Sequence, residues 1–457
     1  MNSEIRYLEN QLGLLQDRRA QLDCNPKGLD EYDLRKEKSA MTRQIRGIEK
    51  QIVELSEEYE PEPAMQFDDS QLAAIDTAVD NKVSIITGGA GTGKTTIIKA
   101  IADRLGGNVT VLAPTGKAAA RLKEATGFYA ETIHRCLGWD SKRFQRSLKD
   151  PFGNTVIIDE ASMVGSWLMA RLLEYVPPRL VLVGDAAQLP PVDAGQPFHD
   201  LLKCRPDLTA TLNFCWRAQG SVHRAAKAIR EGAMPLPRDS SGGEDFCLVK
   251  ISSPGQAVST LAHWAKSGKY DPFQDVILAA KYGDGKEDGG IDHINKVIHE
   301  VVNPASSDRF ETEENGKVWR INDRIICNKN FSKDDLWNGD LGTVKDIDVD
   351  RNLWVALDRD PEELRLLTKE HRREIKLAYC LSVHKSQGSQ FRRVYFVVLK
   401  NQWMMLSRSL IYTGVTRAQK GCVVLGDMGA FRQGINQIKH KRTILQHLAM
   451  MEAIEND

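Results

Sequence analysis

The chain has 457 residues, of which 41% are hydrophobic and 27% are charged, and this balance is typical of a folded, water-soluble protein of roughly two to four domains. Lysine plus arginine matches aspartate plus glutamate at 62 each, so no net charge attracts nucleic acid, and any such binding must use local patches. No apolar run approaches the roughly 20 residues that cross a bilayer, and the polar start of the chain lacks the apolar segment of a signal peptide.

Residues 1–60 predict a helical hairpin. Apolar side chains recur every three or four positions in two stretches, which indicates two amphipathic helices. The members of the two stripes are Ile5, Leu8, Leu12, Leu15 and Leu22, then Met41, Ile45, Ile48, Ile52 and Leu55. Asn25–Gly28 interrupts the pattern, so the helices should fold back as an antiparallel coiled coil, with a linker at Pro61–Pro63. This hairpin either satisfies its own apolar seam or docks a protein partner or a second copy.

A phosphate-binding loop follows the apolar strand expected at Val83–Thr87. Its pattern is Gly-x4-Gly-Lys-Thr, formed by Gly88, Gly89, Ala90, Gly91, Thr92, Gly93, Lys94 and Thr95, with Thr96 next. Such glycines let backbone N–H groups surround a triphosphate, while Lys94 reaches the β- and γ-phosphates and the Thr95 hydroxyl ligates Mg²⁺. The helix expected at Thr96–Leu105 points its positive end at the anion. The pattern predicts an ATP site with Mg²⁺; the alternative is a glycine turn with a chance lysine.

Two further apolar strands end in polar residues suited to hydrolysis. Val156–Ile158 runs into Asp159 and Glu160, where Asp159 would hold Mg²⁺ and Glu160 would orient and deprotonate the attacking water. Leu180–Val183 precedes Gln188, which could sense the γ-phosphate. The alternatives are two solvated acids at a strand end and a polar loop residue before a proline pair.

Apolar strands alternate with helices on both sides of residue 212, which predicts an α/β fold of two parallel-sheet domains. The expected strands include Val109–Leu112, Val276–Ala280, Val394–Val398 and Cys422–Leu425, besides the three that precede the polar residues above. We expect the first domain at 67–212 and the second at 213–457, with a Gly/Pro/Ser-rich stretch at 232–255. Between 338 and 378 the pattern becomes β-like, so we expect a small β-barrel inserted in the second domain.

A second α/β lobe suggests that the two lobes complete one nucleotide site. An arginine from a facing domain can stabilise charge on the γ-phosphate, a contribution of roughly 10³–10⁵ in rate. Arg217 and Arg417 are the candidates in the second domain. The alternative for each is a surface ion pair or a buried structural pair.

These motifs, taken in order, resemble those of superfamily 1 helicases of the RecD-like and Dda-like class over about residues 67–445. The matching segments are Gln71 (the adenine-reading glutamine), Gly88–Thr95 (motif I), Ala113–Ala119 (Ia), Thr132–Arg135 (the next DNA-contact motif), Asp159–Ser162 (II), Gly184–Leu189 (III), Arg217 (IV), Ser382–Gly388 (V), Val415–Arg417 (VI) and Asn338–Gly342, which leads into the inserted barrel. Two departures stand out: motif IV lacks its Arg-Gln pair, and Gln390 stands where relatives often carry glutamate.

The resemblance implies two RecA-like domains and an ATP-dependent helicase that moves 5′→3′ on single-stranded DNA. It adds Gln71, Gln387 and Gly388 to the nucleotide-binding residues. The implied DNA contacts are Pro114, Thr115, Lys117, Thr132, His134, Asn338, His384 and Lys385. A structural role for the histidine at 134 is an equal alternative.

The resemblance also implies a small pin between the motif at Thr132–Arg135 and motif II, here at about residues 136–154. This segment is basic and aromatic, and Phe144 could stack on the last base pair of a fork. The alternative is that Phe144 is an ordinary core or loop aromatic.

The expected partners are single-stranded DNA and forked duplex DNA, with a further protein partner for the N-terminal hairpin, and no membrane. Two other functions fit the same motifs: a translocase that displaces bound proteins without separating strands, and a nucleotide-gated DNA- or partner-binding module. The eight cysteines include no Cys-x-x-Cys pair, which predicts reduced thiols and no zinc site. We expect a monomer in the cytoplasm, at the nucleoid or in a host cytoplasm, and not a secreted protein.

Overall fold

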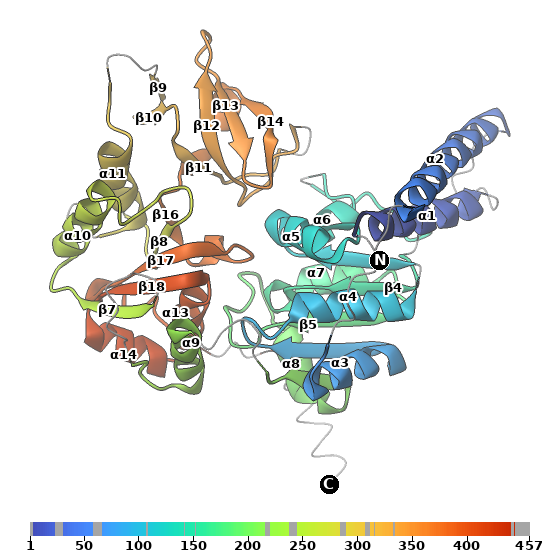
Figure 1. Cartoon of the computed structure of the whole chain (residues 1–457), viewed down its shortest axis with the longest axis horizontal. Helices are drawn as coiled ribbons and strands as arrows, with labels where there is room; N and C mark the ends of the chain where they lie inside the picture. Colours follow the sequence, from blue (N-terminus) through green and yellow to red (C-terminus); the bar gives the residue numbers. More distant parts are fainter. Residues whose placement is uncertain are drawn as a thin grey trace. The chain divides into compact units, whose positions relative to one another are not determined.

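A computed structural model describes residues 3–22, 31–57, 66–106, 108–140, 142–150, 152–214, 220–236, 245–283, 289–306, 311–314, 316–331, 334–439 and 443. The chain divides into two compact units (Figure 1), the first running to residue 186 and resuming at 190–217, the second holding 187–189 and 218–440. Among the described residues, no helix combines the length and the apolar character that crossing a membrane requires.

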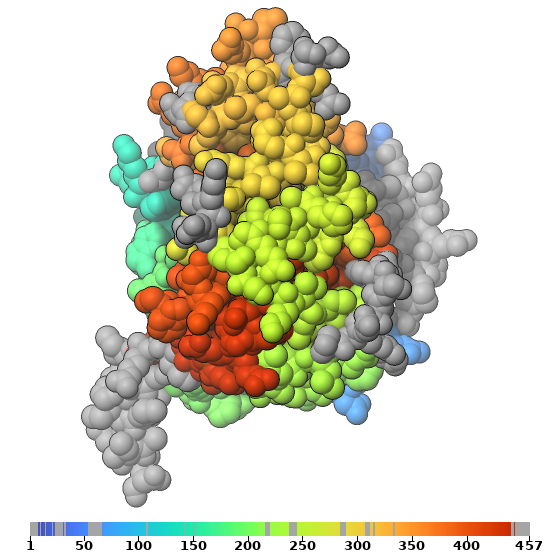
Figure 2. All heavy atoms as spheres, turned by 90° about the vertical axis from the view of Figure 1, so that its left-hand side faces the viewer, coloured from blue at the N-terminus to red at the C-terminus, as the bar shows by residue number. Residues whose placement is uncertain are grey.

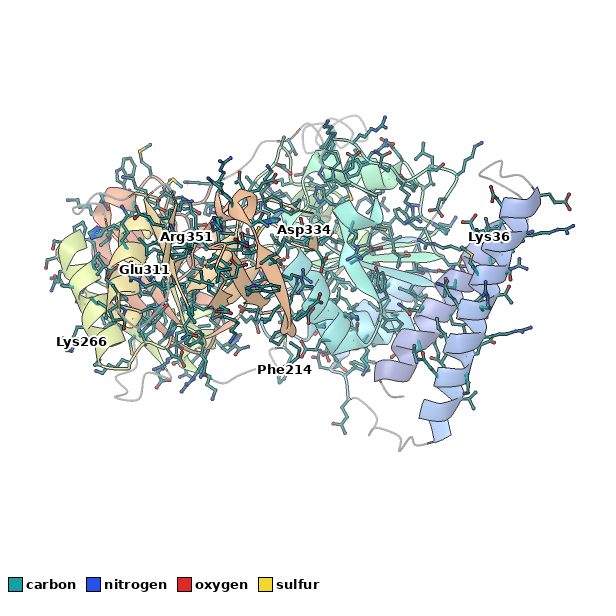
Figure 3. All side chains as sticks on the ribbon, turned by 90° about the horizontal axis from the view of Figure 1, so that it is seen from above. Lys36, Phe214, Lys266, Glu311, Asp334 and Arg351 are labelled. Carbon is teal, nitrogen blue, oxygen red and sulfur yellow. The ribbon has the colours of Figure 1, made fainter. Side chains whose placement is uncertain are left out.

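The predicted helical hairpin is present in the first unit. Helices α1 (Ser3–Gln21) and α2 (Glu31–Glu57) lie side by side (Figure 1), and Arg19 Nε donates to Thr42 Oγ1 at 3.3 Å between them. Figure 3 labels Lys36, an exposed residue of α2. The predicted turn at residues 25–28 and the linker at 61–63 lie outside the described residues.

The first unit is built on a parallel sheet with the strand order β3-β2-β4-β5-β1-β6. The strands are β1 (Val83–Gly88), β2 (Val109–Ala113), β3 (Ala130–Thr132), β4 (Thr155–Ile158), β5 (Leu180–Gly184) and β6 (Thr209–Leu212). The four inner strands are almost entirely buried and were predicted from their apolar runs, as expected for a sheet covered on both faces. The two edge strands, β3 and β6, were not predicted because they are short and partly polar.

Helices cover both faces of this sheet. The helices of this domain are α3 (Asp69–Asp80), α4 (Lys94–Leu105), α5 (Gly116–Thr126), α6 (Ile133–Cys136), α7 (Ser166–Leu173) and α8 (Pro197–Cys204). Neighbouring residues of one strand face opposite sides, so Ile86 packs in a cluster with α3 and α4. Ile85 packs in the opposite cluster, with Leu168 of α7 and Phe198 of α8.

The second unit repeats the parallel arrangement with the strand order β16-β8-β17-β18-β7. Its strands are β7 (Phe246–Lys250), β8 (Val276–Ala279), β16 (Cys380–Ser382), β17 (Phe391–Val398) and β18 (Ala418–Gly426), and its helices are α9 (Ser221–Glu231), α10 (Pro254–Lys266), α11 (Ile291–Val302), α13 (Arg408–Val415) and α14 (Met428–Asn436). The prediction missed β7, which lies inside the stretch expected to be a Gly/Pro/Ser-rich connection. On one face of this unit, α10 (yellow-green) meets the C-terminal part (red) (Figure 2).

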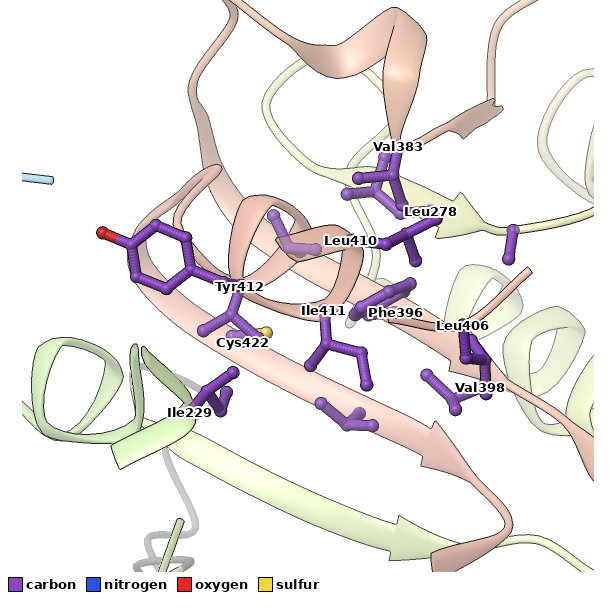
Figure 4. Packing of buried hydrophobic residues seen from close by; sticks show 14 of the residues in the cluster. Ile229, Leu278, Val383, Phe396, Val398, Leu406, Leu410, Ile411, Tyr412 and Cys422 are labelled. Carbon is purple, nitrogen blue, oxygen red and sulfur yellow. The ribbon is translucent and has the colours of Figure 1, made fainter. Parts of the chain in front are cut away.

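The core of this unit forms where α13 crosses the sheet. Figure 4 shows Leu410 and Ile411 of α13 among Phe396 and Val398 of β17, and all four side chains are buried. Gly414 lies in the same helix, and a Cβ there would come within 2.8 Å of the Phe396 ring. The close approach of helix to sheet therefore requires glycine at this position.

A small antiparallel sheet is inserted in the second unit, with the strand order β14-β13-β12-β11-β15. Its elements are β11 (Arg324–Cys327), β12 (Leu341–Ile347), β13 (Leu353–Leu357), β14 (Asp360–Leu367), α12 (Lys369–Arg372) and β15 (Ile375–Leu377), preceded by the pair β9 (Glu311–Glu314) and β10 (Lys317–Arg320). The inserted sheet begins at Arg324, so the predicted start at 338 is wrong. The β-like pattern from 338 omitted β11, which is only four residues long and pairs with strands on both sides.

One buried carboxylate anchors this small sheet to the α/β part of the second unit. Asp323 is fully buried immediately before β11. Its Oδ1 accepts from Asn303 at 2.7 Å and from the Tyr379 hydroxyl at 3.0 Å, and lies 2.9 Å from His299 Nε2. Its Oδ2 accepts from the Arg320 backbone N–H at 2.7 Å. Three segments that are far apart in the sequence therefore depend on one acceptor.

We expect Asp323→Ala to destabilise the second unit by about 3–5 kcal/mol, because it leaves several buried donors without an acceptor. Denaturant unfolding followed by fluorescence measures this loss. Asp350→Ala is the matched control, since Asp350 is an exposed acid of the same small sheet. Equal stability of the two variants would contradict the anchoring role.

Candidate ATP and DNA sites

The predicted ATP-site residues of the first unit lie at one edge of its sheet. Lys94 follows β1, Asp159 and Glu160 follow β4, and Asp185 follows β5. Strands β4, β5 and β1 are consecutive neighbours and all parallel, so their carboxyl ends meet at the same edge, where nucleotides bind in such sheets. Fold and sequence therefore bring the phosphate loop and the two carboxylates together.

The phosphate loop has the backbone that its glycines predict. Gly91 and Gly93 have φ angles of 83° and 82°, in the left-handed region that glycine tolerates best. A Cβ at Gly88 would lie 2.5 Å from Thr92 Oγ1, so glycine is required there too. Lys94 Nζ donates to the Gly88 and Gly89 carbonyls, both at 2.9 Å, which holds the ammonium inside the loop. Ala90, Thr95 and Thr96 complete the loop and the first turn of α4.

Gln71 links the start of α3 to the phosphate loop. Its Oε1 accepts from the Asp68 backbone N–H at 3.2 Å, while Asp68 Oδ1 accepts from the Gln71 N–H at 3.0 Å, so the pair forms a capping box. Its Nε2 donates to the Thr92 carbonyl at 3.2 Å. The predicted adenine contact stays a prediction, and the structure adds a role that the sequence did not suggest: Gln71 braces the loop.

Glu160 is held in a strained position. Its backbone has φ 49° and ψ 36°, a left-handed conformation that costs a residue with a Cβ about 1–3 kcal/mol and is concentrated at functional sites. The Glu160 N–H donates to Asp159 Oδ1 at 2.8 Å, and the Asp159 N–H donates to the Leu112 carbonyl of β2 at 2.9 Å. Within the described residues, the buried Glu160 Oε2 has no hydrogen-bond partner. This oxygen is therefore available to a water molecule, as a general base requires.

The charges around Asp159 suit a divalent cation. Burial, and then the neighbouring charge of Glu160, raise the pKa of Asp159 to about 6, while Lys94 opposes the shift. Asp159 and the Thr95 hydroxyl offer hard oxygen ligands of the kind that Mg²⁺ prefers. Across the described ranges, no three His, Cys, Asp or Glu side chains form a metal cluster. Asp159 and Thr95 would hold Mg²⁺ as two protein ligands, with nucleotide phosphates supplying further oxygen ligands.

Gln188 follows β5 in the sequence, yet its segment packs with the second unit. Residues 187–189 belong to that unit by their contacts. The Leu189 N–H donates to Thr413 Oγ1 of α13 at 2.9 Å, and Leu189 joins the core around α13. Gln188 is buried; its predicted sensing of the γ-phosphate stays a prediction.

Arg417 is buried in the second unit beside motif V. Its Nε donates to the Thr413 carbonyl at 3.2 Å and its Nη1 to the Ser389 carbonyl at 3.3 Å. The Phe391 N–H donates back to the Arg417 carbonyl at 2.9 Å. Arg217 lies outside the described residues, and each unit is described by itself, so the completion of the ATP site by these two arginines stays a prediction.

The segment that contains motif V runs along the strand direction of the second sheet, from the carboxyl ends of the strands to their amino ends. It leaves the carboxyl end of β16 at Ser382 and enters the amino end of the parallel strand β17 at Phe391. Gly388 turns the chain with φ 74°. The buried Gln387 Nε2 has no partner among the described atoms, so this predicted nucleotide contact retains a free donor.

In the first unit, two of the predicted DNA contacts cap neighbouring helices. Thr115 Oγ1 accepts from the Ala118 N–H at 3.3 Å at the start of α5, and Thr132 Oγ1 accepts from the Arg135 N–H at 3.1 Å at the start of α6. The preceding strands β2 and β3 are paired, with Ala113 opposite Thr132. Pro114 and Lys117 flank the first cap. Adjacent helix starts offer backbone N–H groups to phosphates.

The predicted pin is organised by aromatic contacts. Trp139 and Phe144 pair as an antiparallel bridge, with ring centroids 4.8 Å apart. His134 lies 6.2 Å from both rings, and burial lowers its pKa. Phe144 is half-buried and packs against the core, while Trp167 of α7, which the sequence reasoning missed, is 56% exposed beside it. Only the fold brings Trp167 next to the pin.

Two of the predicted DNA contacts of the second unit, Lys385 and Asn338, contact the segment that joins β11 to β12 of the small sheet. Lys385 Nζ donates to Asn328 Oδ1 just after β11, and burial, then Lys376, lower the pKa of Lys385. The Asn338 N–H donates to Asn330 Oδ1 at 2.8 Å in the facing turn. His384 is half-buried, which lowers its pKa. The asparagine at 328 was missed because no local pattern singles it out.

Comparisons with known proteins agree with this architecture. An AAA domain family model matches residues 66–240, the ATP-dependent RecD-like DNA helicase SH3 domain matches 294–357, and the UvrD-like helicase C-terminal domain matches 377–425. The SH3 match starts well before residue 338, as the inserted sheet does. Two parallel α/β units, a phosphate loop and an inserted small sheet define a superfamily 1 helicase.

Two curated relatives narrow this class. The chain is 34% identical over 370 residues to the ATP-dependent RecD2 DNA helicase of Deinococcus radiodurans, covering 80% of this chain but 50% of that protein. It is 30% identical over 431 residues to the RecBCD enzyme subunit RecD of Mycolicibacterium smegmatis, covering 81% of this chain and 73% of that protein. The chain belongs to the RecD-like superfamily 1 helicases, a family of ATP-dependent DNA helicases.

Solved structures show the same fold. A structure of two coordinating Pif1 helicases at forked double-stranded DNA matches with a TM-score of 0.53 and 18% identity, covering 86% of this chain and 98% of that one. The Bacteroides Pif1 helicase in complex with ADP-AlF3 and single-stranded DNA matches with a TM-score of 0.51 and 18% identity, over the same shares. At this identity the likeness concerns the fold alone.

We expect Asp159→Asn to stabilise the first unit at pH 7.5 by about 2 kcal/mol when Mg²⁺ and nucleotide are absent. The pKa of Asp159 is raised in the fold, so the wild-type chain loses stability as the pH rises from the ordinary value of 3.8 to about 6 and has lost it fully above that pH; a neutral amide avoids this loss. At pH 4 the carboxyl is protonated in the fold, and the difference should vanish. Thermal unfolding at both pH values in EDTA measures it, with the exposed Asp80→Asn as control. A variant that is no more stable at pH 7.5 would disprove the burial cost.

Proposed function

We propose that this chain is an ATP-driven motor that moves 5′→3′ on single-stranded DNA and unwinds duplex DNA ahead of it. The observation that carries the proposal is the shared edge of the first sheet, where the phosphate loop and the carboxylates after β4 stand beside the helix starts after β2 and β3. The residues for ATP hydrolysis and the predicted DNA contacts are then neighbours on one rigid sheet. The 5′→3′ direction rests on the resemblance to RecD-like helicases.

Within the ATP site, each residue has a distinct task. When nucleotide binds, the Lys94 ammonium donates to phosphate oxygens instead of to the Gly88 and Gly89 carbonyls, because the charged phosphate oxygens are the stronger acceptors. Thr95 and Asp159 would hold Mg²⁺, which neutralises phosphate charge when it is bound. Glu160 orients the attacking water and takes its proton through the unpaired Oε2. Arg417, with Arg217, would stabilise the charge that develops on the γ-phosphate.

Motif V offers a short route between nucleotide and strand in the second unit. The Ser389 carbonyl accepts a hydrogen bond from the Arg417 guanidinium. Lys385, four residues earlier, donates to Asn328 just after β11 of the small sheet. A shift of Arg417 towards a γ-phosphate would therefore pull on the segment that grips the strand. Backbone contacts of this kind read no sequence, as a motor requires.

ATPase activity measured with single-stranded DNA, with RNA and without polymer tests the motor. DNA should stimulate turnover most. Duplexes that carry one single-stranded tail, either 5′ or 3′, then test the direction. Only the duplex with the 5′ tail should be unwound. Turnover without strand separation on any fork would support a protein-displacing translocase, and negligible stimulation would support a nucleotide-gated binding module.

We expect Glu160→Gln to retain ATP binding and to lower turnover by roughly 10²–10⁴-fold, because the amide cannot accept the proton of water. Equilibrium binding of a fluorescent ATP analogue and steady-state phosphate release measure the two quantities. Glu124→Gln, an exposed acid of α5, serves as control. Turnover near the wild-type rate would remove Glu160 as the base.

We also propose that the hairpin is an arm for a protein partner and not part of the motor. A cavity of about 720 Å³ lies between it and the first sheet, lined by polar side chains such as Gln11, Gln44 and Glu131 together with apolar ones such as Ile48 and Phe152. A hollow contact removes little apolar surface from water and contributes little stability.

A chain that starts at residue 66 should therefore keep the DNA-stimulated ATPase activity within about twofold of the full chain. Thermal unfolding of the truncated chain provides the control for folding. If the truncated chain does not fold, the hairpin belongs to the core of the first unit.

A further inference from the structure

An exposed tryptophan stands at the end of an aromatic group on the first unit. Trp167 is the second residue of α7, and its ring centroid lies 5.2 Å from Phe144 and 5.8 Å from Trp139. Those two rings are half-buried, whereas Trp167 is 56% exposed. Exposing an indole of this size loses hydrophobic stabilisation and leaves an aromatic face that a flat ligand can cover.

The contacts of Trp167 leave part of its ring accessible while fixing its orientation. The Phe144 ring is tilted by only 31° against the indole, and the Trp139 ring meets it edge-on at 83°. Phe144 is held in turn by the Arg171 guanidinium, 5.7 Å from its centroid, and by the core of the unit. A pre-oriented indole can accept a flat ligand without losing side-chain entropy.

The charges nearby favour an anionic ligand. Lys142 and Arg143 are exposed, and their backbone N–H groups donate to Asp140 Oδ1 at 2.9 and 2.8 Å, which fixes the turn that carries them. Arg171 belongs to the same helix as Trp167 and pairs with Glu174, which offsets part of its charge. A protein-docking surface is usually a contiguous apolar patch, whereas an exposed ring next to a basic turn is an arrangement that binds nucleobases with their phosphates.

The aromatic group is also connected to residues that are predicted to contact DNA. Thr132 caps α6, His134 is the second residue of that helix, and the Trp139 N–H donates to the His134 carbonyl at 2.9 Å. His134 lies 6.2 Å from the Trp139 ring, and Trp139 reaches Trp167. A DNA backbone held at the helix caps would bring its bases towards these rings.

We propose that Trp167 is the stacking surface for the nucleobase at the junction of single-stranded and duplex DNA, with Phe144 as its support. This inference rests on the proposed function and assigns the base contact to α7 instead of to the pin. Stacking on the indole stabilises the separated base and so favours opening of the next pair. It does not enter the ATP chemistry.

Four variants of the full chain separate this role from a structural one. Trp167→Ala should slow unwinding of a 5′-tailed fork about tenfold and leave DNA-stimulated ATPase activity within twofold. Trp167→Phe keeps an aromatic face and should unwind near the wild-type rate. Trp403→Ala is the matched control, because Trp403 of the second unit is 49% exposed, and Phe144→Ala tests the support.

Unwinding by Trp167→Ala at the wild-type rate would overturn the proposal. A matching loss of ATPase activity would assign a structural role and overturn it as well. A Phe144→Ala chain that fails to unwind while Trp167→Ala remains active would place the base contact on the pin instead. Thermal unfolding of each variant identifies any that is misfolded.

A binding assay without ATP keeps this test independent of the motor. A fork with 2-aminopurine at the first unpaired position should lose fluorescence when it binds the wild-type chain, because stacking quenches this base. Trp167→Ala should abolish the quench, and Trp403→Ala should preserve it. Equal quenching by all three chains would overturn the inference. A wild-type chain that quenches without unwinding would instead contradict only the proposed motor.

Discussion

The parallel pairing of β4, β5 and β1 is the constraint on which the ATP site depends. The register Val156↔Leu180 and Val83↔Leu180 aligns the three strands, so their carboxyl ends, and the polar loops that follow, emerge at one edge. Each strand is buried on both faces and cannot slip without exposing apolar side chains to water. The buried sheet therefore fixes the relative positions of Lys94, Asp159 and Glu160 before any ligand arrives.

This rigidity allows the edge to hold features that reduce stability. Glu160 adopts a left-handed backbone and keeps an unpaired buried oxygen, and burial disfavours the charged form of Asp159. Each of these costs free energy; a cation would offset the charge of Asp159, and a water molecule would pair with the Glu160 oxygen. The site is therefore organised for its ligands, and the stability of the surrounding sheet offsets the cost.

The second unit connects its parts through a few polar contacts across long sequence separations. Asp323 gathers donors from α11, β10 and the segment before β16, which fixes the small sheet to the α/β core. Lys385 of motif V then meets Asn328 of that sheet, and Arg417 meets Ser389 at the other end of the same motif. Because these contacts are few and directional, a small movement of Arg417 would shift Lys385 relative to the small sheet.

The sequence by itself determined the inner strands, the phosphate loop and the helical hairpin, because burial on both faces, glycine turns and helical spacing are local signals. It did not determine the edge strands β3, β6 and β7, or the start of the inserted sheet at Arg324, because these elements are short and exist only through pairing with distant strands. Tertiary structure alone gave Gln71 its bracing role and placed Trp167 beside Phe144. Such contacts join residues far apart in the chain, and no local pattern of side chains records them.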